Sequence, residues 1–356
     1  MTAARVLGID DEARWREVLP ARASVFGSVE FASIQREYGG VDPRLVALDA
    51  PGGPIGHALH LRPVSGLALS GDRRGELYDA TTPPYSGPFA VGEIEDPIRA
   101  AFSEAVAKWT GEAGVVTEFG HLHPWKARTE LLRGGDIELD REIVYVDLTL
   151  DEERLWRESF THACRKNINR ARREGVRVRA AETAADAREL HRIYELTMDR
   201  QGALESYYFP PEYFVSFLER LPDNSRILLA EHEGRAVAAT LYLHDETDAY
   251  SYLGGADHEA QRVRPTNAIV HEMIRWGRAR GIRRLILGGG YAPDDGIMRF
   301  KSSFSPLRRP FHVYKRVHRP DAYAALCRAW RDRHGTDGAG SGFFPPYRAG
   351  PPQRAR

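Results

Sequence analysis

The order of helices and strands in the second half of the chain constrains the fold most. Period-two and helical hydrophobic patterns follow one another there in a fixed sequence. They predict strand 176–180, helices 185–202 and 210–221, strands 226–233, 235–246 and 248–256, helix 266–281, strand 283–290, a short helix through Lys301, and strand 311–318. This order favours an α+β fold with a mixed, mostly antiparallel sheet flanked by helices.

The same order is similar to that of the GNAT acyltransferase fold. The first half is a weaker copy, with strands predicted at 44–50, 54–64 and 66–70, a helix at 96–114 and a strand at 115–122. We therefore predict a tandem of duplicated GNAT-like domains, 1–150 and 151–332. A single long helix is predicted at 149–175, and the Gly- and Pro-rich tail 333–356 is expected to be poorly ordered.

Composition excludes several classes of protein. A chain of 356 residues is longer than most single domains, so two domains are expected. Fifty basic residues balance fifty acidic ones, so net charge does not indicate a nucleic-acid partner. Only Cys164 and Cys327 are present, which does not support a disulfide framework. Without an apolar run of membrane-spanning length or a signal-peptide core, we expect a cytoplasmic protein without a membrane span; the oligomeric state is not indicated.

The segment after predicted strand 248–256 lacks a feature that GNAT enzymes use to bind acetyl-CoA. Those enzymes hold the pyrophosphate with backbone N–H groups of a Gly-rich turn at a helix start. Here 257–276 contains no glycine, and Pro265 removes one donor. The basic and polar side chains available are Gln261, Arg262 and Arg264. The sequence therefore predicts no pyrophosphate site.

Three stretches carry a more specific resemblance: "AVAATLYLHDETDAYSYLGGA", "NAIVHEMIRWGRARGIRRLILGGG" and "DGIMRFKSSFSP". They resemble the Fem family of aminoacyl-tRNA-dependent peptidyltransferases, most clearly over 151–330. The resemblance implies aminoacyl-tRNA as co-substrate, no cofactor, and an amine acceptor that is a peptidoglycan precursor or an antibiotic-like natural product. Where Fem enzymes acting on nucleotide-linked precursors carry a basic residue in an early helix, only Arg36 is available here, which tilts the expectation toward a natural product.

Lys301 is the expected catalytic residue. The resemblance places the family's proposed catalytic lysine at this "FK" position. Aminolysis of an ester passes through a tetrahedral oxyanion, which a fixed cation stabilises. The three glycines just upstream, Gly288–Gly290, indicate a close approach to the backbone. The alternative is a surface lysine on a short amphipathic helix.

The acceptor site is expected to draw on both halves of the chain. By resemblance, Arg200 and Tyr207 or Tyr208 line the acceptor pocket, and Tyr252 is a further candidate on a central strand. Arginine suits bidentate capture of a phosphate or carboxylate. The first-half candidates for substrate binding are Asp79, Tyr85 in the "PYSGPF" loop, and Arg36. For the aromatic residues, packing in the core is the alternative.

The tRNA-binding candidates lie after Lys301 in a segment without acidic residues: Arg299, Arg308, Arg309, Lys315 and Arg316. They could contact phosphates, although a charge run is usually a solvated face. His121 and His123 are interpreted as a structural pair, and no metal is expected. Two other functions stay open: an acyl-CoA-dependent N-acyltransferase on the same fold, and a non-catalytic binding module.

Overall fold

The computed structural model describes residues 4–20, 23–65, 67, 77–290, 295–335 and 343–349. Contacts divide the chain into two units. Unit 1 comprises Met1–Asp140 and Phe311–Arg356, and unit 2 comprises Arg141–Pro310. The division departs from the predicted boundaries because the chain returns to unit 1 at Phe311, where strand β13 (Arg308–Val317) pairs with β6 (Val115–His121). Segment 311–332 therefore does not belong to the second unit.

Unit 2 contains a mixed sheet in the order β7–β12–β11–β10–β9–β8. The parallel pair in it is β11 with β12, and its other neighbours are antiparallel. The strand bounds are β7 (Asp136–Asp147), β8 (Arg177–Ala180), β9 (Ser225–His232), β10 (Arg235–His244), β11 (Asp248–Ala256) and β12 (Arg284–Gly288). The predicted α+β, GNAT-like order of elements is confirmed.

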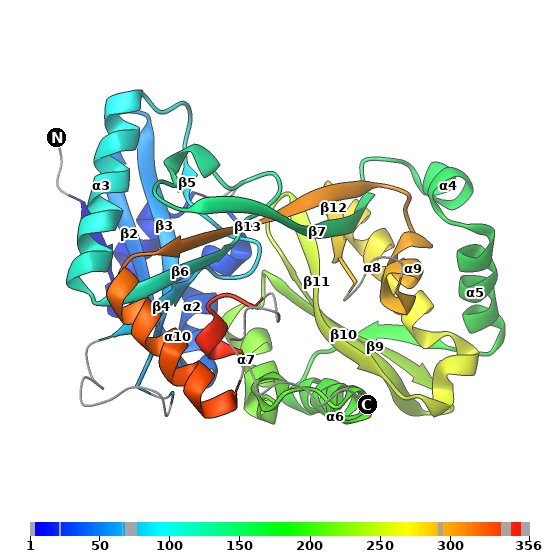
Figure 1. The fold of residues 1–356 in the computed structure, drawn as a ribbon. Helices are drawn as coiled ribbons and strands as arrows, with labels where there is room; N and C mark the ends of the chain where they lie inside the picture. The colour runs from blue at the N-terminus through cyan, green and yellow to red at the C-terminus, as the bar shows by residue number, and fades with distance from the viewer. Residues whose placement is uncertain are drawn as a thin grey trace. The chain divides into compact units, whose positions relative to one another are not determined.

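Helices cover both faces of the unit 2 sheet. One face packs against α6 (Ala184–Gln201) and α7 (Pro211–Arg220), and the other against α5 (His162–Arg173) and α8 (Pro265–Ala279) (Figure 1). Alternating strand residues explain this arrangement: Leu228 and Ala230 of β9 join the core under α5 and α8. The sheet is therefore buried on both sides, and its accessible groups lie at strand ends.

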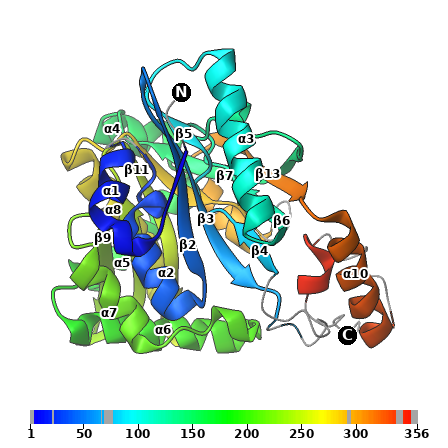
Figure 2. The ribbon, with the colours of Figure 1, turned by 90° about the vertical axis from the view of Figure 1, so that its left-hand side faces the viewer.

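Unit 1 repeats this plan. Its sheet runs β1–β2–β3–β4–β6–β13, and β4 with β6 is its parallel pair. Helices α1 and α2 lie on one face and α3 on the other (Figure 2). The remaining bounds are β1 (Arg5–Leu7), α1 (Glu12–Val18), α2 (Val29–Gly39), β2 (Asp42–Ala50), β3 (Gly53–Pro63), β4 (Tyr78–Thr81), β5 (Phe89–Ala90), α3 (Asp96–Glu112) and α10 (Pro320–His334).

Two local predictions differ from the structure. The predicted helix 149–175 is broken: α4 (Glu152–Arg154) and a π-helical turn (Leu155–Ser159) end at Phe160, and the Thr161 hydroxyl caps α5 by accepting from the Cys164 N–H. Part of the tail is ordered, since α10 reaches His334 and Tyr347 is buried. The predicted strand 66–70 lies outside the described residues except for Leu67, as do 336–342 and 350–356 of the tail.

No helix among the described residues is long and apolar enough to cross a membrane.

Candidate active site

The unit 2 sheet opens into a fork between its two parallel strands. Pairing of β11 with β12 stops at Tyr250 and Ile286, although β11 continues to Ala256 and β12 to Gly288. Beyond the last pair, the two strands no longer satisfy each other's backbone groups, so this end of the sheet is open to other partners. A ligand site at the carboxyl ends of parallel strands is expected on physical grounds.

The turn that follows β12 explains the three glycines. Gly288 has φ of +81°, a conformation that glycine adopts without strain. A Cβ on Gly289 would lie 2.8 Å from Cδ of Arg141, and one on Gly290 would lie 2.6 Å from Oδ1 of Asp295. The close approach predicted from the sequence is therefore made by the protein's own side chains.

Lys301 lies on α9 (Gly296–Ser302), the short helix predicted from the sequence. Asp295 caps this helix by accepting from the Met298 N–H at 2.6 Å. The helix turns Lys301 back toward the fork, where its Nζ donates to the carbonyl oxygen of Gly289 at 2.6 Å. Lys301 is thus a partly buried group at the end of β12 rather than a surface lysine.

The charge on Lys301 is destabilised in this position. Burial lowers the pKa of its ammonium group to about 8; Asp295 opposes the change and Arg141 adds to it. Near neutral pH the group is mostly a cation, and it can exchange its proton close to physiological pH. Such a perturbed titratable group at an open strand end is a candidate catalytic residue.

Tyr252 lies on the other arm of the fork, two residues after the last β11–β12 pair. Its hydroxyl is 3.1 Å from that of Tyr213 on α7, and its ring contacts Phe217 edge-to-face. The Tyr252 side chain thus contacts α7, whereas Lys301 contacts the end of β12, and a site shared by the two residues stays a prediction.

The other unit 2 candidates gather at the C-terminal end of α6. Arg200 donates to the carbonyl oxygen of Ala256 at 3.4 Å, at the end of β11. The Tyr208 hydroxyl donates to Asp199 at 2.9 Å, and both Tyr207 and Tyr208 are exposed. These three residues lie together at a surface, farther along β11 than Tyr252.

The loop between β11 and α8 corresponds to the one that binds pyrophosphate in an acyl-CoA enzyme. Here its backbone N–H groups bond to carbonyls of the same loop. It forms the 3-10 helix η6 (Glu259–Val263), whose Ala260 and Val263 are buried. The amides of Ala260 and Arg264 donate to carbonyls within the loop. Arg264, with φ of +60°, precedes Pro265 at the start of α8. These loop N–H groups are therefore already used, and the absence of a pyrophosphate site stays a prediction.

The equivalent fork in unit 1 is closed. Beyond the β4–β6 pairs, the backbone of Ser86 donates to His121 and accepts from His123, at 3.1 and 2.7 Å. Thr82 also donates to Phe119 at 2.9 Å. The open strand ends that could receive a substrate between parallel strands are therefore those of unit 2.

The unit 1 candidates have structural partners. Asp79 is buried, and it accepts from Thr117, Tyr347 and Arg348 at 2.5–2.7 Å. The prediction that Asp79 binds substrate is therefore wrong, because its carboxylate oxygens are occupied in holding the segment around Tyr347. The Tyr85 ring packs against Phe26 and Phe311. Arg36, on α2, is half-exposed and lies 3.8 Å from Asp10.

The basic segment is divided between the two units. Arg299, Arg308 and Arg309 lie in unit 2, and Lys315 and Arg316 in unit 1. Arg308 donates to Ser302 Oγ and to two carbonyl oxygens in the turn after α9, and Lys315 pairs with Glu138 at 2.6 Å. Arg299 and Arg309 are the exposed members.

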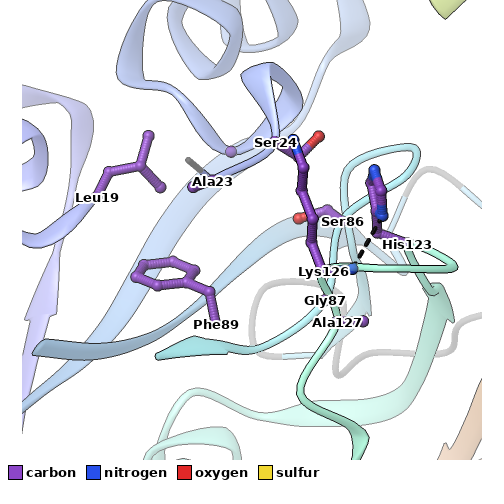
Figure 3. Close-up of a pocket in the computed structure, with 10 residues that line it drawn as sticks. Leu19, Ala23, Ser24, Ser86, Gly87, Phe89, His123, Lys126 and Ala127 are labelled. Atoms are coloured by element: carbon purple, nitrogen blue, oxygen red, sulfur yellow. Dashed lines mark hydrogen bonds between the residues drawn. The ribbon is translucent and has the colours of Figure 1, made fainter. Parts of the chain in front are cut away.

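Unit 1 contains a cavity beside Ser24, Phe89 and Lys126 that cannot hold a substrate. It measures about 20 Å³, room for about one water molecule. Figure 3 shows Lys126 extending toward Ser24 beside it, and His123 accepting from the Lys126 backbone N–H at 3.1 Å. No group of three His, Cys, Asp or Glu side chains in the described part of the chain could hold a metal ion.

Sequence reasoning missed three residues around the fork: Arg141, Asp295 and Tyr213. The aspartate before a short helix is a helix-cap signal that could have identified Asp295. Arg141 and Tyr213 approach the fork from β7 and α7, which no local pattern predicts.

Comparisons with known proteins agree with this fold. The GNAT acetyltransferase domain model matches residues 158–302. The chain is 27% identical over 168 residues to the UDP-N-acetylmuramoylpentapeptide-lysine N(6)-alanyltransferase of Weissella viridescens, a match covering 46% of this chain and 48% of that protein. The chain thus spans about half the length of this curated relative.

Solved structures show the same architecture over most of the chain. The crystal structure of FemX superposes with a TM-score of 0.71 at 11% identity, covering 91% of this chain and 99% of that one. L-PGS from Bacillus licheniformis superposes with a TM-score of 0.52 at 15% identity, covering 84% and 94%. The resemblance to Fem-type proteins and the predicted GNAT-like fold are confirmed.

Proposed function

We propose that this protein is an aminoacyltransferase that uses aminoacyl-tRNA as donor and forms an amide bond with an acceptor amine. The observation that carries the proposal is the position of the Lys301 ammonium at the open β11–β12 fork. The similarity to an alanyltransferase supports aminoacyl transfer. The closed η6 loop argues against the acyl-CoA alternative, because its amides cannot turn toward a pyrophosphate without breaking the loop.

In the proposed reaction the acceptor amine attacks the carbonyl carbon of the ester that links the amino acid to tRNA. The carbonyl oxygen becomes an oxyanion, and the C–O bond to the ribose then breaks with transfer of a proton to the leaving hydroxyl. Lys301 stabilises the oxyanion as a cation already in place. Tyr252 and Arg200 shape the acceptor side, and the exposed Arg299 and Arg309 meet phosphates of the donor.

The acceptor is proposed to be the amine of a peptidoglycan precursor or of another amine-bearing molecule. The alanyltransferase relative supports the first. Arg36 on α2, the position that the Fem resemblance points to, is half-exposed and lies 3.8 Å from Asp10, which leaves the second open.

The test uses pooled tRNA charged with labelled amino acids. The protein is incubated with a lysine-containing UDP-N-acetylmuramoyl pentapeptide or with a panel of amines, with and without prior ribonuclease treatment. The proposal predicts labelled amide product that ribonuclease abolishes and that Lys301→Ala reduces strongly. Product that survives ribonuclease contradicts the tRNA donor.

A further inference from the structure

Arg141 lies beside the glycine turn that follows β12. It belongs to β7, the strand that pairs with β12 up to Val144 and Gly288. Its side chain is exposed, yet Nη1 donates to the carbonyl oxygen of Gly290 at 3.0 Å.

The stem of Arg141 also lies directly over the turn. A Cβ on Gly289 would come within 2.8 Å of Cδ of Arg141 and 3.0 Å of the Glu142 carbonyl oxygen. Any side chain at this position would displace either the arginine or the β7 backbone. Glycine at 289 is therefore required by the path of Arg141, and the two define the shape of the turn together.

Successive carbonyls of the turn hold one cation each. Gly289 accepts from the Lys301 ammonium at 2.6 Å, and Gly290 accepts from the Arg141 guanidinium at 3.0 Å. The carboxylate of Asp295 caps α9 next to them. Among the residues described around the turn, the cluster therefore contains two positive groups, Lys301 and Arg141, and one negative group, Asp295, an arrangement suited to an anion that develops nearby.

We propose that Arg141 is a positioning residue of this site: it fixes the turn that receives the Lys301 ammonium, and it places a second, permanent positive charge beside that ammonium. The inference rests on the proposed function for its catalytic meaning. Its structural part, the effect of Arg141 on Lys301, is independent of any substrate.

Two charged groups act on Lys301 in opposite directions. Asp295, from the start of α9, raises the pKa of the ammonium, whereas Arg141, from β7, lowers it. Removal of the guanidinium is therefore expected to raise the pKa of Lys301, and Arg141→Lys is expected to leave it nearly unchanged. Arg157, exposed and paired with Glu153 in unit 2, provides a matched control as Arg157→Ala.

The first measurement needs neither donor nor acceptor. Wild type, Arg141→Ala, Arg141→Lys and Arg157→Ala are trace-labelled with an amine-reactive reagent across pH 6–11, and the Lys301 peptide is quantified by mass spectrometry. The expected result is a Lys301 titration about 0.5–1 pH unit higher in Arg141→Ala than in wild type. The control is expected to match wild type. An unchanged titration in Arg141→Ala, with thermal unfolding showing a folded protein, overturns the proposal.

The second measurement follows aminoacyl transfer against pH. Arg141→Ala is expected to lower kcat about tenfold at pH 7. It is also expected to raise the pH at which the rate falls on the alkaline side, whereas Arg141→Lys retains most of the activity. A purely structural role would lower the rate without moving the alkaline limb. If neither wild type nor any of the variants transfers an amino acid but the Lys301 titration still shifts in Arg141→Ala, the proposed function fails and the Arg141 inference stands. If wild type is active and Arg141→Ala equals it at every pH, the inference alone fails.

Discussion

The ammonium of Lys301 donates to the carbonyl oxygen of Gly289 across 2.6 Å, where β12 leaves its parallel neighbour. One hydrogen bond with a neutral carbonyl does not repay the desolvation of a charge. Burial accordingly lowers the pKa of this group to about 8 from 10.5. Lys301 is thus held at a cost to stability, which is common for residues kept for function.

Lys301→Met is therefore expected to stabilise the protein at pH 7, by about 1–2 kcal/mol after the lost hydrogen bond is discounted. Because the folded-state pKa is depressed, the penalty in wild type is complete below about pH 8 and disappears as pH rises toward 10.5. Urea unfolding of both proteins at pH 7 and pH 10 measures the difference. A destabilised variant, or a difference that does not shrink at pH 10, contradicts this account.

Glu118 in unit 1 is expected to show the opposite behaviour. Burial alone raises its pKa, but hydrogen bonds from His318 and His57, both at 3.0 Å, hold it at about 2. Its contribution to stability is present above about pH 4.5 and lost as pH falls toward 2. Glu118→Gln is expected to cost about 3 kcal/mol at pH 7, measured by urea unfolding. The exposed Glu112→Gln serves as control; equal effects of the two substitutions refute the prediction.

Acetyl-CoA is expected not to bind. Pro265 supplies no N–H at the start of α8, and the Asn267 amide already donates to the carbonyl oxygen of Arg264, so a pyrophosphate is expected to find no cluster of N–H groups there. Isothermal titration calorimetry with acetyl-CoA is expected to give no saturable heat. A dissociation constant below about 100 µM, roughly −5.5 kcal/mol, returns the acyl-CoA alternative to first place.

Gly289→Ala is expected to reduce aminoacyl transfer about tenfold or more, since the new methyl group meets Cδ of Arg141 at 2.8 Å and displaces the carbonyl that holds Lys301. Gly296→Ala is the matched control, because a Cβ there meets nothing within 4 Å. Initial rates at saturating donor measure both variants. Full activity in Gly289→Ala shows that the geometry of the turn is unimportant.

Local patterns predicted most of the fold. The hydrophobic periods of unit 2 identified its strands and helices, including the short helix α9 through Lys301. They could not show that β13 returns to pair with β6, because strand partners are set by long-range pairing rather than by local sequence. They also missed the break at Phe160, where the Thr161 cap outweighs an otherwise helical pattern.

The candidate site was only partly accessible from the sequence. Lys301 was identified through the Fem resemblance, and the glycines correctly indicated a close approach. The identity of the approaching groups, Arg141 and Asp295, depends on tertiary packing. Asp79 was misjudged because an acidic residue in a loop-flanked strand gives no sign of its distant partners Tyr347 and Arg348.

The most direct test of the role of Lys301 is a single-turnover measurement with preformed aminoacyl-tRNA and an accepted amine. Lys301→Ala is predicted to slow the chemical step about 10²–10³-fold, with Lys301→Arg recovering part of the rate and Lys108→Ala, an exposed change in unit 1, having no effect. A chemical step in Lys301→Ala within twofold of wild type contradicts the claim that this ammonium stabilises the oxyanion.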